Sequence, residues 1–215
     1  MGVGNKQNSN VYEPVSYGLK RSVFVKYRPA FLVVSGPSGT GKSTLIHHLL
    51  GKYGGKIHFS ISATTRKPRI GEKDGVDYFF LSHDEFKKKI EEDEFLEWQE
   101  VHGNYYGTLK SEVIPYLEAG IDVVLDIDVK GGFVIKKKIP QAALVFVAPP
   151  SIDELKKRLF KRSTDTPEII EKRLKVASWE CEQGRNYDYV VVNDDLDEAC
   201  KLIEAIYLAE KLKLR

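Results

Sequence analysis

The chain has 215 residues, of which 42% are hydrophobic and 30% are charged, with a formal net charge of +2. This length is typical of a single domain with a substantial core, and the nearly balanced charge argues against a general nucleic-acid-binding surface. Two cysteines are too few for a disulfide framework, and no apolar run approaches the roughly 20 residues that cross a bilayer, so we expect a cytoplasmic protein that binds neither nucleic acid nor membrane.

The N-terminal stretch, residues 1–27, lacks hydrophobic periodicity and contains Gly, Asn, Ser and Pro residues. We expect a poorly ordered extension there. Its start superficially resembles a myristoylation signal, but Lys6 stands where Ser or Thr is required. It lacks the apolar segment that is typical of a secretion signal, and Glu13 together with few arginines argues against a transit peptide.

A phosphate-binding loop follows the first apolar run. Residues 36–43 read Gly-Pro-Ser-Gly-Thr-Gly-Lys-Ser, a complete G-x-x-x-x-G-K-[ST] motif between a strand pattern at 31–35 and an amphipathic helix pattern at 43–53. Glycines let successive backbone N–H groups surround a phosphate at the N-terminus of a helix. Lys42 would then reach the outer phosphates, and the Ser43 hydroxyl would ligate Mg²⁺. The alternative is a chance match in a glycine-rich turn, but both flanking patterns favour a nucleoside triphosphate site. The ATP-binding residues predicted in this segment are Gly36, Pro37, Ser38, Gly39, Thr40, Gly41, Lys42, Ser43 and Thr44.

Strand and helix patterns alternate from this loop to the end of the chain. The apolar strand candidates are 31–35, 57–61, 122–127, 143–148 and 189–192. Most of them do not alternate with polar residues, which is typical of strands covered on both faces. Because helical stretches separate them, we predict a three-layer α/β fold with a parallel sheet.

Residues 60–108 interrupt this alternation. Shorter strand patterns at 78–81 and 95–101 alternate with polar residues, and turn residues lie between them. We expect a small mixed β/α lobe, partly antiparallel, inserted after the second strand of the core.

Several helix starts carry capping signals. Ser82-x-x-Glu85 and Ser151-x-x-Glu154 fit the capping box, and Asp195-x-x-Glu198 is a similar start. Thr166-Pro167 places a proline at the first position of a helix. We therefore predict helices that begin at these four places.

A second cluster of polar residues lies in the inserted segment. Residues 62–69 follow an apolar strand and contain hydroxyls together with Arg66 and Arg69. The planar fork of arginine suits bidentate phosphate binding, and Tyr78 and Tyr106 would add hydroxyl donors. The alternative is that both arginines are ordinary exposed loop charges.

These motifs, taken together, resemble the guanylate kinase family, and the resemblance runs from about Phe31 to Glu210. The matching motifs are Ser62-x-Thr-Thr-Arg66-x-x-Arg69-x-Gly71-Glu72, Asp77-Tyr78, Glu97-Trp98, Asn104-Tyr105-Tyr106-Gly107-Thr108, Asp126-Ile-Asp128, Pro149-Pro150-Ser151 and Val192-Asn193-Asp194-Asp195. They occur in the order and with the spacing of the family.

The resemblance implies a guanylate kinase domain over residues 28–215, with a GMP-binding lobe at 60–108 and a helical lid at 153–175. The core would then comprise 28–59, 109–152 and 176–215. It also implies transfer of the γ-phosphoryl group from MgATP to GMP, and also to dGMP, in purine nucleotide metabolism. In the family, the acceptor phosphate is held by residues that match Ser62, Arg66, Arg69, Tyr78 and Tyr106, and guanine is read by those that match Glu97, Thr108 and Asp128.

The hydrogen-bonding groups of guanine are consistent with these base-reading residues. Its Watson–Crick edge presents two adjacent donors beside an acceptor, so the Glu97 carboxylate can accept both donors while the Thr108 hydroxyl donates to O6. Adenine would leave a buried carboxylate unpaired. The alternatives are that Glu97 is merely a polar strand position, and that Thr108 caps a helix that contains Leu109.

Phosphoryl transfer to GMP needs no general base, because the acceptor phosphate is largely ionised with a second pKa of about 6. Basic residues that neutralise the transferring group are the expected catalytic equipment. Arg158 and Arg162 share one helical face, and the resemblance makes them lid arginines together with Arg173. Solvated helix charges are the alternative. The predicted catalytic residues are Lys42, Arg66, Arg69, Arg158, Arg162, Arg173 and Asp126.

Asp126 ends an apolar strand in the form of a Walker-B carboxylate, so it would orient Mg²⁺ through water. Its alternative role is to hydrogen-bond the turn that follows, and Asp128 could equally cap a helix that begins at Val129. Asn193 matches a family position near the ATP adenine.

Two other functions compete with a monomeric guanylate kinase. Scaffold domains with this fold bind phosphopeptides without turnover, but they typically degrade the phosphate loop or lose lid arginines, which this chain keeps. A kinase for another nucleoside monophosphate, or a switch-type NTPase, is disfavoured by Glu97, Thr108 and Asp128.

Overall fold

The computed structural model describes residues 28–101, 103–161 and 167–213, so the extension predicted over 1–27 lies outside the described residues. A five-stranded sheet forms the centre, in the order β2-β7-β1-β8-β9 with every neighbouring pair parallel. Its strands are β1 (Phe31–Ser35), β2 (Ile57–Phe59), β7 (Asp122–Asp126), β8 (Ala143–Ala148) and β9 (Tyr189–Val192). The predicted parallel α/β fold is confirmed, although β2 and β7 end earlier than the sequence pattern suggested.

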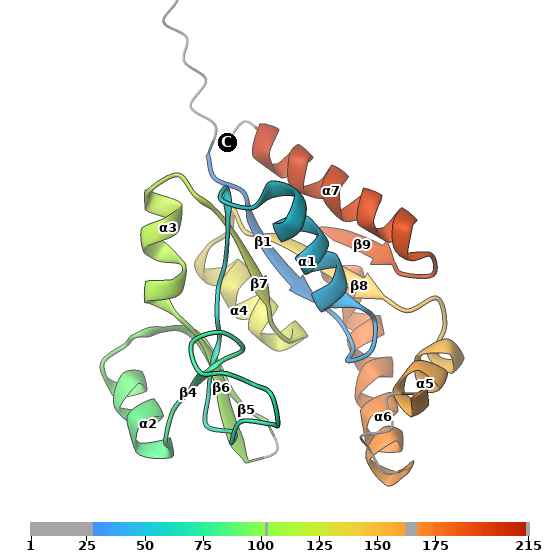
Figure 1. Cartoon of the computed structure of the whole chain (residues 1–215), viewed down its shortest axis with the longest axis horizontal. Helices are drawn as coiled ribbons and strands as arrows, with labels where there is room; N and C mark the ends of the chain where they lie inside the picture. Colours follow the sequence, from blue (N-terminus) through green and yellow to red (C-terminus); the bar gives the residue numbers. More distant parts are fainter. Residues whose placement is uncertain (1–27, 102, 162–166, 214–215) are drawn as a thin grey trace, which may run out of the picture.

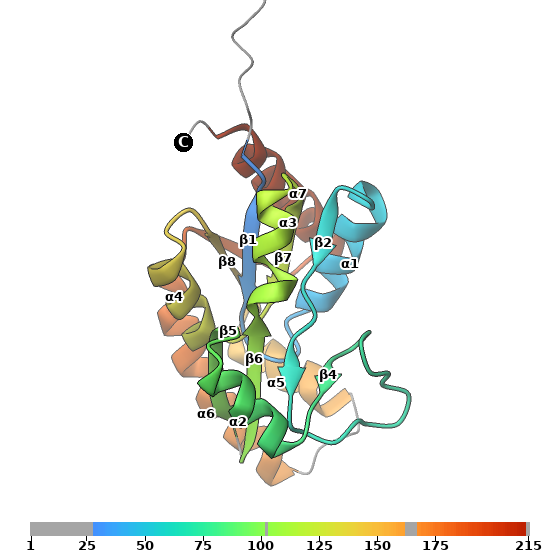
Figure 2. The ribbon, with the colours of Figure 1, turned by 90° about the vertical axis from the view of Figure 1, so that its left-hand side faces the viewer.

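Helices cover both faces of this sheet (Figures 1 and 2). On one face lie α1 (Lys42–Tyr53) and α7 (Leu196–Leu212), and on the other lie α3 (Ile114–Glu118) and α4 (Val129–Lys138). The two hydrophobic clusters between sheet and helices consist of fully buried aliphatic and aromatic side chains. Burial of this apolar surface on both faces is the main stabilising contribution to the sheet.

The chain after β8 forms two helices that pack against each other, α5 (Ile152–Lys161) and α6 (Pro167–Gln183). Leu155, Leu159, Ile170 and Ala177 bury a small cluster between them. A short 3-10 helix, η2 (Gly184–Asn186), then leads into β9. No helix within the described ranges is both long enough and apolar enough to span a bilayer.

The inserted segment forms a second sheet in the order β4-β3-β6-β5. Its strands are β3 (Ala63–Thr64), β4 (Phe79–Phe80), β5 (Phe95–Val101) and β6 (Asn104–Leu109), and α2 (His83–Glu91) packs on it through the stacked rings of Phe86 and Phe95. Pairing is parallel between β3 and β4 and antiparallel elsewhere. The expected mixed lobe is therefore present, with β4 shorter than the pattern at 78–81.

The alternative in which Thr108 caps a helix that contains Leu109 is wrong, because Leu109 ends β6, where it pairs with Phe95 of β5. A 3-10 helix, η1 (Lys110–Glu112), follows, and α3 begins only at Ile114. Tertiary strand pairing overrides the local helical pattern here, so Thr108 is a strand residue rather than a helix cap.

The helix starts follow their capping signals. Ser82 and Glu85 form the complete capping box of α2. The Asp195 carboxylate accepts from the Glu198 N–H at 2.9 Å at the start of α7, and the Ser151 hydroxyl accepts from the Glu154 N–H at 3.1 Å. Helix α6 begins at Pro167, as predicted.

Two segments connect the lobe to the core, and Glu112 ties them together. Its carboxylate, on the segment that leaves the lobe, accepts from the backbone N–H of Ile61 at 3.2 Å and contacts His58 Nε2 at 3.2 Å on the segment that enters it. The His58 ring also stacks on Tyr116. This junction restricts how the lobe is set relative to the sheet.

Asp122 anchors the opposite end of the sheet. Its buried carboxylate accepts from the Ala30 N–H at 2.7 Å, from the Tyr207 hydroxyl at 2.7 Å and from Lys211 Nζ at 2.6 Å. It thus joins the start of the first strand to the last helix.

Replacing Asp122 with alanine is expected to lower the free energy of unfolding by about 3 kcal/mol, because a carboxylate and its three buried or half-buried partners lose their hydrogen bonds together. Urea denaturation measures this value. Glu182→Ala, which removes an exposed carboxylate from α6, is the matched control and should change it by less than about 0.5 kcal/mol. A value for Asp122→Ala as small as that of the control would contradict the anchoring role.

Candidate active site

The phosphate loop joins β1 to α1 and has the backbone that an anion site requires. Gly36, Gly39 and Gly41 all adopt positive φ, and Gly41 is the N-cap of α1. A Cβ at Gly36 would lie 2.3 Å from the Val147 carbonyl oxygen, so only glycine fits where the loop crosses β8. The loop therefore presents backbone N–H groups at a helix N-terminus.

Lys42 lies across the mouth of this loop. Its ammonium group donates to the carbonyl oxygens of Gly36 at 2.7 Å and Pro37 at 3.3 Å. These carbonyls hold the positive charge close to the place where the loop N–H groups would gather phosphate oxygens. The ammonium group can give up these carbonyl contacts and bind a phosphate oxygen with only a small movement.

Asn193 locks the other side of the loop. Asn193 is buried, and its side-chain Nδ2 donates to the Thr40 carbonyl at 2.7 Å. The backbone carbonyl of Asn193 accepts from Arg158 Nη1 at 2.9 Å. Beside these residues is a cavity of about 390 Å³. It is lined by Gly39, Gly41, Thr44, Arg158, Lys161, Asn193, Asp194 and Leu196. The structure thus brings Arg158 and Asn193 to a cavity at the edge of the phosphate loop, large enough for part of a nucleotide.

Ser43 and Asp126 meet at the phosphate end of the loop. The Ser43 hydroxyl donates to Asp126 Oδ2 at 3.4 Å, and burial raises the pKa of Asp126 while the Lys42 charge lowers it. A desolvated carboxylate beside a hydroxyl is an oxygen donor set that suits Mg²⁺. These two residues therefore fit a magnesium ion held partly by the protein and partly by water and phosphate.

In the lobe, Arg66 is held by Glu72. The two side chains form a bidentate ion pair, with Nη1–Oε2 and Nη2–Oε1 distances of 2.9 Å, and Glu72 holds the pKa of Arg66 above its usual value. The Arg66 guanidinium lies 5.4 Å from the centre of the Tyr78 ring, and that ring meets Tyr106 edge-on. Arg66, Tyr78 and Tyr106 are therefore gathered in one place.

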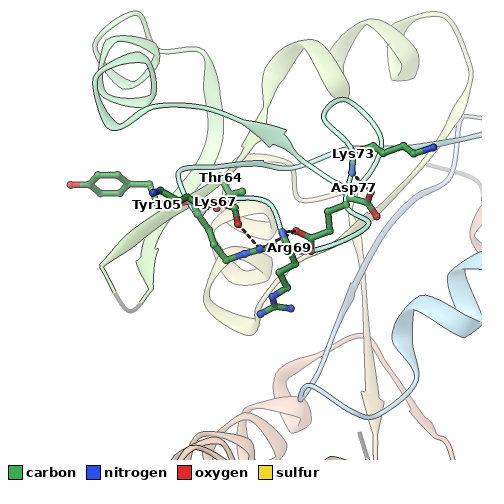
Figure 3. Close-up of polar contacts among 8 residues, drawn as sticks. Thr64, Lys67, Arg69, Lys73, Asp77 and Tyr105 are labelled. Carbon is green, nitrogen blue, oxygen red and sulfur yellow. Dashed lines mark hydrogen bonds and ion pairs between the residues drawn. The ribbon is translucent and has the colours of Figure 1, made fainter. Parts of the chain in front are cut away.

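Arg69 is held by its backbone rather than by its side chain. Its N–H donates to Glu72 Oε2 at 2.7 Å, and Figure 3 shows its guanidinium pointing away from the contacts drawn there. The same loop is closed further on by the Lys73 N–H, which donates to Asp77 Oδ2 at 2.8 Å (Figure 3). Arg69 is thus exposed on a loop of defined shape, which leaves its charge available to an anion.

Glu97 and Thr108 form a buried pair on neighbouring strands of the lobe. The Thr108 hydroxyl donates to Glu97 Oε1 at 2.7 Å, and the two residues face each other in the register of β5 and β6. Burial raises the pKa of Glu97 to about 7, and the charge of Asp128 adds to this rise. A Cβ on Gly131 of α4 would lie 2.9 Å from Glu97 Oε2, so the start of α4 packs directly against the Glu97 carboxylate.

Asp128 has the capping role that the sequence left open. It is the N-cap of α4, and its Oδ1 accepts from the Gly131 N–H at 2.8 Å. The charge of Asp128 helps to raise the pKa of Glu97, so the two carboxylates lie close enough to interact. Capping and base reading are compatible here.

Electrostatic coupling links the lobe to the phosphate loop. Burial raises the pKa of Tyr78, and the next largest cause is the charge of Asp126 in the core. Burial likewise raises the pKa of Glu180 on α6, which lies within the field of both Lys42 and Asp128. Groups from the two candidate pockets are therefore close enough to influence one another.

Two of the predicted residues, Ser62 and Arg173, have fewer described contacts with these clusters. Ser62 lies half-buried just before β3, where its carbonyl accepts from the Phe79 N–H. Arg173 is half-buried on α6. Arg162 lies outside the described residues.

Sequence reasoning missed two residues, Glu72 and Gln99. Glu72 stood in a quoted motif without a role, although an acid three residues from one arginine and six from another is a signal for an ion pair. Gln99 follows Glu97 by two residues, so strand alternation puts both on the same face of β5. Its Nε2 donates to Asp128 Oδ1 at 2.7 Å.

Comparison with known proteins supplies the family context. A sequence model described as guanylate kinase matches residues 28–210. A guanylate kinase of Clostridium perfringens (strain 13 / Type A) is 50% identical over 187 residues, 87% of this chain and 86% of the relative. One from Bacillus subtilis (strain 168) is 47% identical over 189 residues, 88% of this chain and 93% of the relative. The crystal structure of a guanylate kinase from Anaplasma phagocytophilum superposes with a TM-score of 0.71 at 34% identity, covering 87% of this chain and 88% of the other.

Proposed function

This chain belongs to the guanylate kinase family and is an ATP:GMP phosphotransferase, and we propose how its residues divide that work. The phosphate loop, residues 36–44, and Asn193 hold ATP. The inserted lobe holds GMP, with its phosphate at Ser62, Arg66, Arg69, Tyr78 and Tyr106 and its base at Glu97, Thr108 and Asp128. We assign the core to 28–59, 109–152 and 176–215, the GMP lobe to 60–108 and the lid to 153–175.

The buried Glu97–Thr108 pair carries the assignment of the base site. A carboxylate that is 6% exposed and accepts one hydroxyl still has lone pairs for the two donors of guanine. An adenine in the same place would turn a ring acceptor toward it, which leaves the carboxylate unpaired. The pair therefore supports guanine over adenine.

Glu72 supports the assignment of the phosphate site. Its carboxylate takes up the Nη1–Nη2 edge of Arg66 and fixes the orientation of the guanidinium. Tyr78 and Tyr106 lie beside that guanidinium. A phosphate entering here would meet an arginine whose orientation is already set.

The transfer requires little covalent chemistry from the protein. The GMP phosphate, with a second pKa of about 6, supplies its own ionised nucleophile. The residues then position both nucleotides and neutralise the charge on the transferring group. We assign this neutralisation to Lys42, Arg66, Arg69, Arg158, Arg162 and Arg173.

We propose that Ser43, and Asp126 through water, hold Mg²⁺ with ATP. Such an ion would neutralise part of the charge on the ATP phosphates when it is bound. Asp126 also keeps the Ser43 hydroxyl oriented through their hydrogen bond.

The free thiols of Cys181 and Cys200 support a reducing compartment, and we propose a monomeric, cytoplasmic enzyme of purine nucleotide metabolism.

A panel of acceptors tests the base assignment. With MgATP and AMP, CMP, UMP, GMP or dGMP as acceptor, we expect ADP formation with GMP and dGMP at kcat/KM values about 10²-fold or more above the others, because the other bases leave Glu97 unpaired. A coupled assay of ADP release measures it. Equal use of AMP would overturn the proposed base site, and ATP consumption that ignores every acceptor would favour an NTPase.

A further inference from the structure

Among the described residues, two side-chain hydrogen bonds join β5 of the GMP lobe to α4 of the core: Lys138 Nζ donates to the Leu96 carbonyl at 2.5 Å, and the other involves Gln99. Gln99 Nε2, on β5, donates at 2.7 Å to Oδ1 of Asp128, the residue that caps α4. The amide nitrogen must face this carboxylate, because an ionised carboxylate can only accept. The same oxygen also accepts from the Gly131 N–H at 2.8 Å, so one atom of Asp128 is held from both sides.

The position of Gln99 in the sheet places this contact next to the residues assigned to GMP. Glu97 pairs with Thr108 across β5 and β6, and Gln99 pairs with Tyr106 at the next rung on the same face. Gln99 therefore lies opposite Tyr106, which is assigned to the phosphate, and one rung from the Glu97–Thr108 pair assigned to the base. It is half-buried, whereas its neighbour Glu100 points to the other face and is exposed.

Glu97 and Asp128 are two carboxylates assigned to the same proposed base site, so each affects the ionised form of the other. Asp128 acts on Glu97 as a like charge, which disfavours the ionised form of Glu97. An amide donor on Oδ1 balances part of the Asp128 charge and restricts its side-chain torsions. It does so while leaving Oδ2 of Asp128 available to hydrogen-bond the nucleobase.

We propose that Gln99 is a positioning residue for GMP, which fixes the Asp128 carboxylate at the base pocket and holds the lobe against the core on that side. This inference rests on the proposed GMP site. It assigns no contact with the transferring phosphoryl group to Gln99.

The consequence is a selective effect on GMP. In Gln99→Ala, Asp128 loses a charge-assisted hydrogen bond, and we expect KM for GMP to rise about tenfold. The cavity beside Asn193 lies on the opposite side of the sheet centre and does not include Gln99. KM for ATP and kcat should therefore each change by less than about threefold.

A double-mutant cycle separates positioning from general loosening of the lobe. Asp128→Ser keeps a good N-cap for α4 but is too short to reach Gln99. If Gln99 acts through Asp128, adding Gln99→Ala to Asp128→Ser should raise KM for GMP by less than about twofold further. Gln99→Glu, which places a like charge against Asp128, should raise KM for GMP at pH 8 more than Gln99→Ala does.

Glu100→Ala is the matched control, and thermal melting of each variant reports its stability. An unchanged KM for GMP in Gln99→Ala would overturn the inference. A full tenfold rise in KM for GMP when Gln99→Ala is added to Asp128→Ser would also overturn it. Equal changes in KM for ATP and GMP would mean that Gln99 is merely structural. If the wild-type enzyme fails to use GMP at all, the proposed function fails; if it uses GMP and Gln99→Ala matches it, only this inference fails.

Discussion

Replacing Lys42 with alanine is expected to lower kcat by a factor of about 10³ or more while the fold is retained. The ammonium group is held at the loop mouth by the Gly36 and Pro37 carbonyls, where ATP phosphates would gather. Without it, the developing charge on the transferring phosphoryl loses its nearest cation from the loop. GMP-dependent ADP release measures kcat, and circular dichroism with a thermal melt checks the fold.

Lys137→Ala is the matched control for Lys42→Ala. Lys137 is an exposed lysine near the C-terminal end of α4, away from the phosphate loop. Its removal should leave kcat within about twofold of the wild-type value. A near-normal kcat in Lys42→Ala would show that ATP is not held by the loop.

Replacing Glu97 with alanine should lower kcat/KM for GMP by about 10²-fold or more and leave KM for ATP within about threefold. The reason is that both guanine donors lose their acceptor, and Thr108 loses the partner that it contacts at 2.7 Å. Steady-state kinetics with each substrate varied in turn measures both constants. Equal effects on the two KM values would refute the base-reading role, and Glu100→Ala should change neither.

The raised pKa of Glu97 adds a pH dependence to this prediction. Burial raises the pKa of Glu97 to about 7, so near neutral pH a substantial part of the free enzyme holds a protonated Glu97 that can accept only poorly from guanine. In the wild type, kcat/KM for GMP should therefore fall as the pH drops below about 7, by up to tenfold per unit. In Glu97→Gln this fall of kcat/KM below about pH 7 should disappear. The dependence that comes from ionisation of the GMP phosphate, near pH 6, should remain.

The effect of the same group on stability has the opposite direction. The folded-state pKa lies above the usual value of 4.5, so the native protein binds more protons than the unfolded chain between pH 4.5 and about 7. The contribution of Glu97 to the free energy of unfolding therefore falls as the pH rises through that window. Urea denaturation of wild type and Glu97→Gln at pH 5 and pH 8 should show this difference, and a parallel dependence in both proteins would contradict it.

The parallel sheet could be predicted because each of its strands is a short apolar run that local composition reveals. Ala143–Ala148 and Tyr189–Val192 were bounded correctly from the sequence. The strands of the lobe were harder to predict. Ala63–Thr64 has two residues, and Asn104–Leu109 has mixed polarity, so neither contains a periodic signal. β3 exists because it pairs with β6, which is distant in the sequence, so no local window contains that pairing.

The sequence by itself determined the phosphate loop, the family and the residue types at both proposed nucleotide sites, because these depend on short motifs whose chemistry is local. Only the tertiary structure decided what surrounds those residues. Glu97 becomes a carboxylate with a pKa of about 7 because α4 and Thr108 enclose it, and Arg66 is oriented because its loop folds back on Glu72. The Gln99–Asp128 contact joins a strand of the lobe to a helix of the core. Burial and contacts between separate elements depend on how those elements pack, and the order of residues along the chain does not specify that packing locally.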